Sequence, residues 1–210
     1  MQKVLYILSQ TLSIILHPLF MPTYGMILYM MVMQNRLSNL PSLYIWLSII
    51  GTSILTAIIP ISLIFILLKK GQIDSLHIEN SKQRTTPYIY TLICFGFWCY
   101  FLRVTMHLPH IWLFIAIGAT IALAIVMLIN HWWKISAHLT GMGGLLGGIC
   151  SMALFYSMLP SALIISVLII SLLLMYARLY TNAHTPMQVV SGYLLGILCT
   201  FIPNLIIYYA

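Results

Sequence analysis

Long runs of apolar residues, separated by short polar stretches, dominate this chain. Seven apolar segments can be drawn, at residues 5–33, 43–68, 88–107, 111–133, 139–159, 161–177 and 187–209. Several of them approach the roughly 20 residues that an α-helix needs to cross the hydrocarbon core of a bilayer. A transmembrane β-barrel has short alternating segments in place of such runs. The pattern therefore predicts an all-α fold, a polytopic bundle of six or seven transmembrane helices.

The first segment is the reason for the uncertain number of crossings. Pro18 and Pro22 lie in its middle, and proline removes a helix hydrogen bond and clashes with the preceding turn. We expect this segment to be kinked, or split into a short interfacial piece and a short span, and we favour six crossings. His17 precedes the first of these prolines, and we expect its ring to bond a carbonyl that the kink sets free.

The connections between the segments predict one domain that covers residues 1–210. One connection, residues 69–87, is long and polar, and the others are short. Short connections place consecutive helices side by side and antiparallel. The run GMGGLLGG at residues 141–148 supplies small residues at helical spacing, which let transmembrane helices approach closely.

Composition supports a membrane protein and narrows its chemistry. The chain is 62% hydrophobic and 5% charged, whereas soluble domains carry about a quarter charged residues. The net charge of +7 fits positive loops that face anionic headgroups. Nucleic-acid binding would require a solvated basic domain, and the sequence contains none. Two acids, Asp74 and Glu79, are too few for an Asp-rich magnesium site, and the four cysteines lack zinc-type pairing. We expect no metal and no other cofactor.

Three polar clusters, at residues 82–87, 131–138 and 178–184, are related by the order of the segments. Two apolar segments separate each cluster from the next. Two crossings return a chain to the side that it left, so the three clusters lie on one face of the membrane whatever happens at the N-terminus. His107 and His110 fall at the opposite face by the same argument, and we exclude them from the site.

The shared face gathers residues that suit a multiply charged anion. It collects four cations, three histidines, a serine and a glutamine: Lys82, Arg84, Lys134, Arg178, His131, His138, His184, Ser136 and Gln188. Arginine binds tetrahedral oxyanions through a rigid fork of donors, and lysine adds a point charge. Helix starts after His138 and His184 would add N–H donors and a positive dipole end. The pattern predicts a site for the phosphate of a lipid; the alternative is that these cations only extend to the headgroups and set topology.

The motifs resemble those of the type-2 phosphatidic acid phosphatase and vanadium haloperoxidase superfamily, in its membrane lipid phosphatase branch. SAH at residues 136–138 resembles its serine-x-histidine core. The spacing from Arg178 to His184 is that of its third motif, and SKQRTTP at residues 81–87 is similar to its first. The three motifs occur in the family's order across residues 82–192.

The resemblance implies a role for each matched residue. His184 would be the nucleophile that forms a phosphohistidine, and His138 the general acid that protonates the leaving lipid oxygen. The phosphate oxygens would be held by five residues: Lys82, Arg84, Ser136, Ala137 through its backbone N–H, and Arg178. Such phosphoryl transfer relies on positioning and on electrostatic stabilisation of negative charge, and histidine can both attack and donate near neutral pH.

The chain departs from the family pattern at specific positions. Lys82 and Arg84 are two apart and Pro87 does not directly follow an arginine, so the first motif is compressed. Ile135 and Ala137 stand where the second motif has proline and glycine. Two crossings separate the first and second motifs, where simpler members have a shorter connection.

Gln188 is the largest departure, because the family has an aspartate at this position. That aspartate would orient the nucleophilic imidazole and stabilise its positive charge during attack. A glutamine oxygen can accept a hydrogen bond and fix the tautomer, but it carries no full charge, and a carboxylate-to-amide change costs orders of magnitude in serine-protease triads. Three alternatives stay open: a slower phosphatase or lipid phosphotransferase, an enzyme in which another group supplies the charge, and a phosphate-lipid binder without turnover. We favour an active enzyme.

Localisation follows less directly from charge. With seven crossings, the motif face and the N-terminus carry seven of the nine Lys and Arg residues, against Arg36 and Arg103 opposite. The positive-inside rule would place that face in the cytoplasm. Four of its seven Lys and Arg residues are, however, the candidate phosphate ligands. Without them three cationic residues on this face stand against two on the other, and the rule does not decide the orientation. Because bacterial relatives of this type commonly face the periplasm, the resemblance favours a bacterial inner membrane protein with a periplasmic site. The expected partners are a lipid phosphate and membrane lipids; the sequence leaves the oligomeric state open.

Overall fold

The computed structural model describes residues 2–36, 40–74, 81–156 and 161–209, without the side chains of Asn35, Arg36, Ser81 and Lys82. Within these ranges every regular element is a helix, as the apolar runs predict. In chain order they are α1 (Gln2–Ile15), η1 (Pro18–Phe20), α2 (Met21–Arg36), α3 (Ser42–Ser53), η2 (Ile54–Ile58), α4 (Ile59–Lys69), α5 (Ser81–Tyr100), η3 (Phe101–Thr105), α6 (His110–Ile129), α7 (Ala137–Tyr156), α8 (Ser161–Tyr180) and α9 (Pro186–Tyr209).

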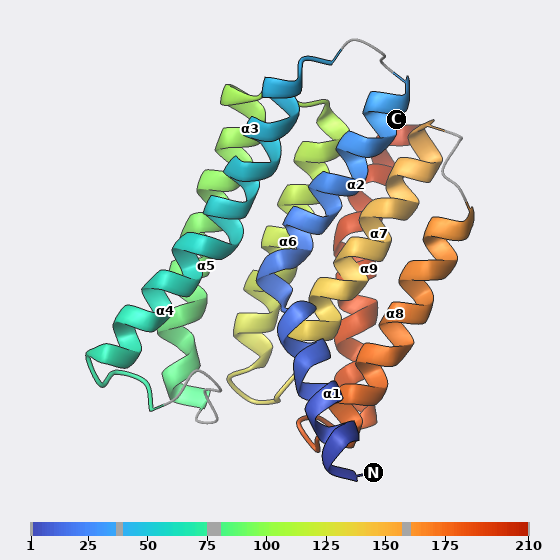
Figure 1. Ribbon diagram of the computed structural model, residues 1–210. Coiled ribbons are helices and arrows are strands. Elements are labelled where there is room, and N and C mark those ends of the chain that lie inside the picture. The colour runs from blue at the N-terminus through green and yellow to red at the C-terminus, as the bar shows by residue number, and fades with distance from the viewer. Residues whose placement is uncertain (1, 37–39, 75–80, 157–160, 210) are drawn as a thin grey trace.

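Seven stretches of the described chain are long and apolar enough to cross a membrane, so this is an integral membrane protein. They are Gln2–Gln34, Ser42–Lys69, Gln83–Thr105, His110–Ile129, Ala137–Tyr156, Ser161–Tyr180 and Pro186–Tyr209. The preference for six crossings is therefore not supported. The first stretch runs the full height of the bundle, which places the N-terminus at the same end as the α6–α7 and α8–α9 connections (Figure 1).

The first span is broken where the two prolines predict it. α1 ends at Ile15, a single 3₁₀ turn follows at Pro18–Phe20, and α2 continues from Met21. His17 is extended (φ −65°, ψ 138°) and its Nδ1 accepts a hydrogen bond from the Leu19 N–H at 3.4 Å. The expectation that His17 would bond a freed carbonyl is thus wrong for this nitrogen, because a residue at the start of a helical turn meets unsatisfied N–H groups.

Glycines bring α7 and α9 into close contact, as the run at residues 141–148 predicts. A Cβ on Gly143 would collide with the Tyr193 carbonyl oxygen of α9, and a Cβ on Gly196 would collide with the Thr140 carbonyl oxygen of α7. The starts of the two helices are joined as well, since the Ser136 N–H donates to the Gln188 carbonyl oxygen at 3.2 Å. This contact fixes the second and third motifs relative to each other.

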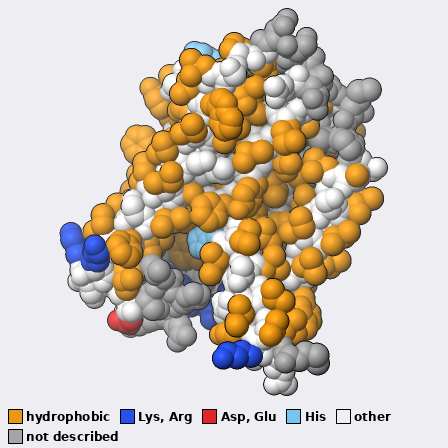
Figure 2. Space-filling model, in the orientation of Figure 1, with side chains coloured by type: hydrophobic (Ala, Val, Ile, Leu, Met, Phe, Trp, Pro, Cys, Tyr) orange, Lys and Arg blue, Asp and Glu red, His pale blue; other side chains and the backbone are white. Residues whose placement is uncertain are grey.

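The remaining helices surround this pair and leave one side open. α1 packs on α8, and α4 packs on α5. In Figure 1 these two pairs lie on opposite sides of the lower half of the bundle. Figure 2 shows the molecule hollowed between α4 and α1, with a histidine side chain inside the hollow.

Candidate active site

A cavity of about 1570 Å³ opens between these helices and contains most of the predicted site. Its polar end is formed by Arg84, Asn130, Lys134, His138, Arg178 and His184. Arg84 comes from the first turn of α5, and Lys134 comes from the α6–α7 connection. His138 comes from the start of α7, Arg178 from the last turn of α8, and His184 from the α8–α9 connection. The prediction that the three clusters share one face is confirmed for these residues. Lys82 is in the first turn of α5, but its side chain lies outside the described residues.

A helix-terminating motif at the end of α8 brings Arg178 and His184 together. The Ala183 N–H bonds the Arg178 carbonyl, and the Asn182 N–H bonds the Leu179 carbonyl. These two bonds define a Schellman motif, in which the residue after the C-cap is left-handed, and Asn182 has φ 52°. Asparagine tolerates this conformation better than most residues. The chain therefore turns sharply between the cation and the histidine.

The hydrogen bonds of His184 determine its tautomer. Its Nδ1 lies 3.1 Å from the Lys134 carbonyl oxygen and 3.3 Å from Gln188 Oε1. The Thr185 N–H also donates to Gln188 Oε1, at 3.1 Å, so that side-chain atom is the amide oxygen and not the nitrogen. Since both neighbours of Nδ1 are acceptors, Nδ1 carries the proton in the neutral imidazole. The lone pair is then on Nε2.

Gln188 has a second role that was not predicted, although a sequence pattern indicates it. α9 begins at Pro186, so Thr185 is the N-cap residue and Gln188 the third residue of the helix. A glutamine at this position that accepts from the N-cap N–H forms one of the two hydrogen bonds of a capping box. The sequence Thr-Pro-Met-Gln at residues 185–188 is the signature of such a start. Gln188 thus caps α9 and orients His184 with the same oxygen.

Electrostatics keep the His184 imidazole neutral. Burial, and then the positive charge of Arg178, lower the pKa of His184 from its usual 6.5 to about 4. The hydrogen bonds to Lys134 and Gln188 act in the opposite direction but do not outweigh burial. At neutral pH the ring is therefore unprotonated at Nε2.

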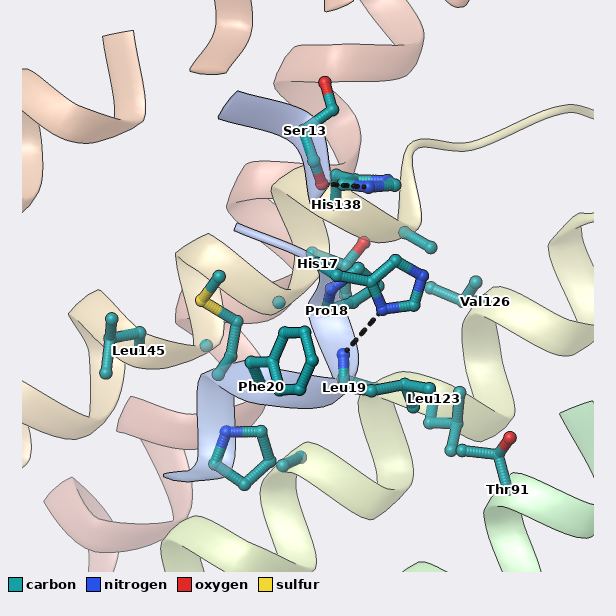
Figure 3. Close-up of a pocket in the computed structure, with 18 of the residues that line it drawn as sticks. Ser13, His17, Pro18, Leu19, Phe20, Thr91, Leu123, Val126, His138 and Leu145 are labelled. Carbon is teal, nitrogen blue, oxygen red and sulfur yellow. Dashed lines mark hydrogen bonds between the residues drawn. The ribbon is translucent and has the colours of Figure 1, made fainter. Parts of the chain in front are cut away.

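His138 lies at the start of α7 and is held by the first span. Its Nε2 is 3.1 Å from the Ser13 carbonyl oxygen of α1, so Nε2 carries a proton and the lone pair of the neutral ring is on Nδ1. The His17 ring meets the His138 ring edge to face, with centroids 5.3 Å apart. Figure 3 shows the His138–Ser13 and His17–Leu19 bonds side by side. His17 lines the cavity, and its position beside His138 was not predicted.

Ser136 and Ala137 occupy different positions at this helix start. Ser136 is fully buried, and its Oγ accepts a 3.5 Å bond from the Leu139 N–H as the N-cap of α7. Its hydroxyl is not among the groups that line the cavity, so the predicted phosphate contact is replaced by a capping role. Ala137 lines the cavity, and as the first residue of a helix it has an N–H with no intrahelical acceptor.

The cations of the polar end differ in their contacts. Arg178 is half-buried, and its Nε is a buried atom without a hydrogen-bond partner in the described part of the chain. Arg84 donates from Nη1 to Asn130 Oδ1 at 3.2 Å, and Asn130 Nδ2 donates to the Tyr88 hydroxyl at 3.3 Å. Asn130 was not predicted as a site residue, because an amide just after a transmembrane run carries no distinctive sequence signal. A buried unsatisfied guanidinium N–H is a group that an anion would satisfy.

The other histidines of the described ranges, His107, His110 and His131, do not line this cavity. His131 is exposed and packs against Trp132, as expected of an interfacial belt. His107 and His110 are at the start of α6, at the opposite end of the bundle. In the described ranges, no three His, Cys, Asp or Glu side chains are grouped so that they could hold a metal ion.

The sequence and the structure were compared with known proteins. The chain matches no family model, no curated protein and no solved structure.

Proposed function

We propose that the protein is a metal-independent lipid-phosphate phosphatase that acts through a phosphohistidine on His184. The observation that carries the proposal is the tautomer of His184. Its Nδ1 proton is held by two oxygens, so its Nε2 lone pair is available in a cavity that also contains Arg84, Lys134 and Arg178. A neutral nucleophile beside several cations is the arrangement that attack on a phosphate anion requires.

The reaction would proceed in two balanced steps. Nε2 of His184 forms a bond to phosphorus while the bond from phosphorus to the lipid oxygen breaks, and His138 gives that oxygen a proton. Water then attacks phosphorus and gives a proton to His138 Nδ1 while the bond from phosphorus to His184 Nε2 breaks. Inorganic phosphate leaves, His184 returns to its neutral form, and His138 is again doubly protonated. His138 would donate from Nδ1, because its Nε2 proton is bonded to the Ser13 carbonyl. This requires the doubly protonated ring, which the negative charge of a bound phosphate would stabilise.

The cations would stabilise the charge of the transferring group. Arg178 offers its unsatisfied Nε–H, Arg84 and Lys134 add positive charge, and the Ala137 N–H adds a helix-start donor. Lys82, two residues before Arg84, is proposed as a further ligand on the basis of the first motif. The hollow between α1 and α4 would admit the lipid sideways from the bilayer.

The glutamine at position 188 is compatible with turnover in this scheme. The Lys134 carbonyl supplies a second acceptor for the Nδ1 proton, so two dipoles share the role that one carboxylate has in the family. Two dipoles stabilise an imidazolium less than a full negative charge does. We therefore expect a slower phosphatase, and we propose a bacterial inner membrane location with the site facing the periplasm.

The rival function is a lipid-phosphate binder without turnover, which the uncharged Gln188 favours.

An assay of phosphate release distinguishes the two functions. Purified protein is incubated with a panel of phosphatidate, polyprenyl phosphate, polyprenyl pyrophosphate and lipid A phosphates, and phosphate release is measured for wild type and His184→Ala. His110→Ala, a histidine change at the opposite end of the bundle, is the matched control. Release by wild type and His110→Ala but not by His184→Ala supports the phosphatase. Equal release by wild type and His184→Ala would refute the catalytic assignment, and lipid binding with no release would establish the rival. Transfer of phosphate to an added alcohol would identify a phosphotransferase.

A further inference from the structure

The cavity continues from the polar end as an apolar arm between α6 and α7. The arm is lined by Trp112, Ile115, Ala119, Gly144, Gly148 and Met152. On α6 the cavity-lining positions run from Trp112 to Val126 at intervals of one, three or four residues, and on α7 they run from Ala137 to Met152 at intervals of one, two or three. This spacing is one face of each helix, so the cavity follows both helices along their length. One end of the cavity is cationic and the other is apolar.

The whole cavity, measured along α7 from its polar end, is longer than one leaflet of a bilayer. Ala137 and Met152 are fifteen positions apart, which is about 22 Å at the helical rise of ~1.5 Å per residue. The hydrocarbon core is about 30 Å thick, so one leaflet accounts for about 15 Å. The arm therefore extends past the middle of the membrane towards the face opposite the polar end.

We infer that the apolar arm binds the hydrocarbon chain of the substrate inside the helix bundle, with the phosphate at the polar end. This inference rests on the proposed function for the phosphate end of the cavity. The occupant must be both anionic and apolar, because the two ends belong to one continuous cavity. A lipid phosphate with a chain that reaches beyond its own leaflet meets both requirements. A lipid that presents only its headgroup to the site would leave the arm unused.

Gly144 controls how far a chain can enter. It lines the arm, seven positions after Ala137, or about 10 Å along the helix. A Cβ on Gly144 would meet one neighbouring atom, Thr200 Cγ2 of α9, at an ordinary 3.6 Å, so there is room for a Cβ at this point in the wall of the arm. Gly144→Leu is therefore expected to plug the arm and to leave the polar end intact.

Gly96 provides a matched control. It is an exposed glycine within α5, and a Cβ placed on it would meet no atom within 4 Å. Gly96→Leu makes the same chemical change on the lipid-facing surface. A loss specific to Gly144→Leu cannot then be attributed to the helix propensity or hydrophobicity of leucine.

The first test compares hexyl phosphate with octadecyl phosphate as substrates, by kcat/KM in detergent micelles. Because a chain in a micelle is already in apolar surroundings, we expect the plug to act through steric exclusion. Gly144→Leu should lower kcat/KM for octadecyl phosphate about tenfold or more, the effect of overpacking a filled site. It should leave kcat/KM for hexyl phosphate unchanged. Gly96→Leu should leave kcat/KM for both substrates unchanged. An equal effect of Gly144→Leu on both substrates, or none on either, would overturn the inference.

The second test does not depend on turnover. Octadecyl phosphate with a diazirine at the end of its chain is photolysed with the protein, and the labelled peptides are identified by mass spectrometry. We expect labels near Trp112 and Met152 in wild type and in His184→Ala, and their loss in Gly144→Leu. Labels confined to lipid-facing surfaces would overturn the inference. Labels in the arm of a wild-type protein that releases no phosphate would support the chain site and refute the phosphatase, so the two failures are distinguishable.

Discussion

His138 and His184 precede or begin neighbouring helices and line the same cavity, yet the structure holds them in opposite tautomers. His184 donates a hydrogen bond from Nδ1–H to the Lys134 carbonyl and Gln188, which leaves Nε2 as the basic nitrogen. His138 donates a hydrogen bond from Nε2–H to the Ser13 carbonyl, which leaves Nδ1 as the basic nitrogen. The same side chain is therefore left with a basic Nε2, as the proposed nucleophile requires, in one place and is anchored to the first span in the other.

The difference arises from what each helix start contacts. α9 begins with a capping box whose glutamine oxygen faces His184. α7 begins with a serine cap, so its histidine is free to reach another helix. The role of a histidine in this site is thus decided by its acceptors, and removing an acceptor or a nitrogen separates the two roles.

The largest effect is expected from His184→Asn. The asparagine Nδ2 can still donate to the Lys134 carbonyl, as imidazole Nδ1 does, but the nucleophilic Nε2 is lost. We expect kcat on a lipid phosphate to fall about 10⁴-fold or more, as when a catalytic nucleophile is removed, with little change in thermal stability. Retained activity in a stably folded variant would show that another group attacks phosphorus.

His138→Gln should give a smaller loss that depends on the leaving group. The glutamine Nε2 can replace the imidazole bond to the Ser13 carbonyl, but an amide cannot act as a general acid. We expect about a 10²-fold fall in kcat for an alkyl phosphate and a fall of less than about threefold for p-nitrophenyl phosphate, whose leaving group needs no protonation. The same loss for both substrates would indicate that His138 only holds α1 in place.

Gln188→Glu tests whether the missing charge limits the rate. Glutamate has the same length and keeps the capping box, but it places a negative charge beside His184 Nδ1. We expect kcat to rise about tenfold, since an ion stabilises imidazolium more than a dipole does. Gln188→Ala should lower kcat about tenfold and cost about 1 kcal/mol of stability through loss of the cap. A slower Gln188→Glu enzyme would contradict the orienting role.

The pH dependence of stability gives a further test of the His184 environment. The pKa of His184 is about 4 in the folded protein and 6.5 when the ring is unperturbed. Between these values the unfolded chain binds the proton more readily, so stability contributed by this residue decreases as pH falls from about 6.5 to about 4. Thermal unfolding in detergent at pH 7 and pH 5 should show a smaller destabilisation for His184→Asn than for wild type. An equal pH effect in both proteins would place the pKa of His184 near its usual value.

Ser136→Ala should have the smallest effect on the reaction. The family resemblance makes this hydroxyl a phosphate ligand, whereas the structure makes it the cap of α7. We expect a loss of about 1 kcal/mol in stability with kcat/KM changed less than about twofold. A loss of kcat/KM of about tenfold with unchanged stability would restore the ligand role.

The fold and the meeting of the three clusters were predictable because they follow from apolar run length and from the number of crossings between clusters. A close helix contact at residues 141–148 was predictable from the glycine run, but its partner α9 was not, because short connections favour consecutive helices as neighbours. The tautomers were not, because they depend on the backbone carbonyls of Ser13 and Lys134, and a carbonyl has no side-chain signature. The position of His17 beside His138 depends on how a broken helix packs, which periodicity does not encode.

The contact between the first span and α8 has a consequence for how the protein is made. About 165 residues separate the end of α1 from the end of α8, so at roughly 5 to 20 residues per second α1 waits in the membrane for roughly 10 to 30 seconds before its neighbour emerges. During that time Ser9 and Ser13, buried in the finished bundle, face lipid. Ser13 Oγ bonds the Ser9 carbonyl of its own helix, so this hydroxyl needs no partner from the later chain. The first helix can therefore be inserted alone, and its Ser13 carbonyl is met by His138 only when α7 arrives.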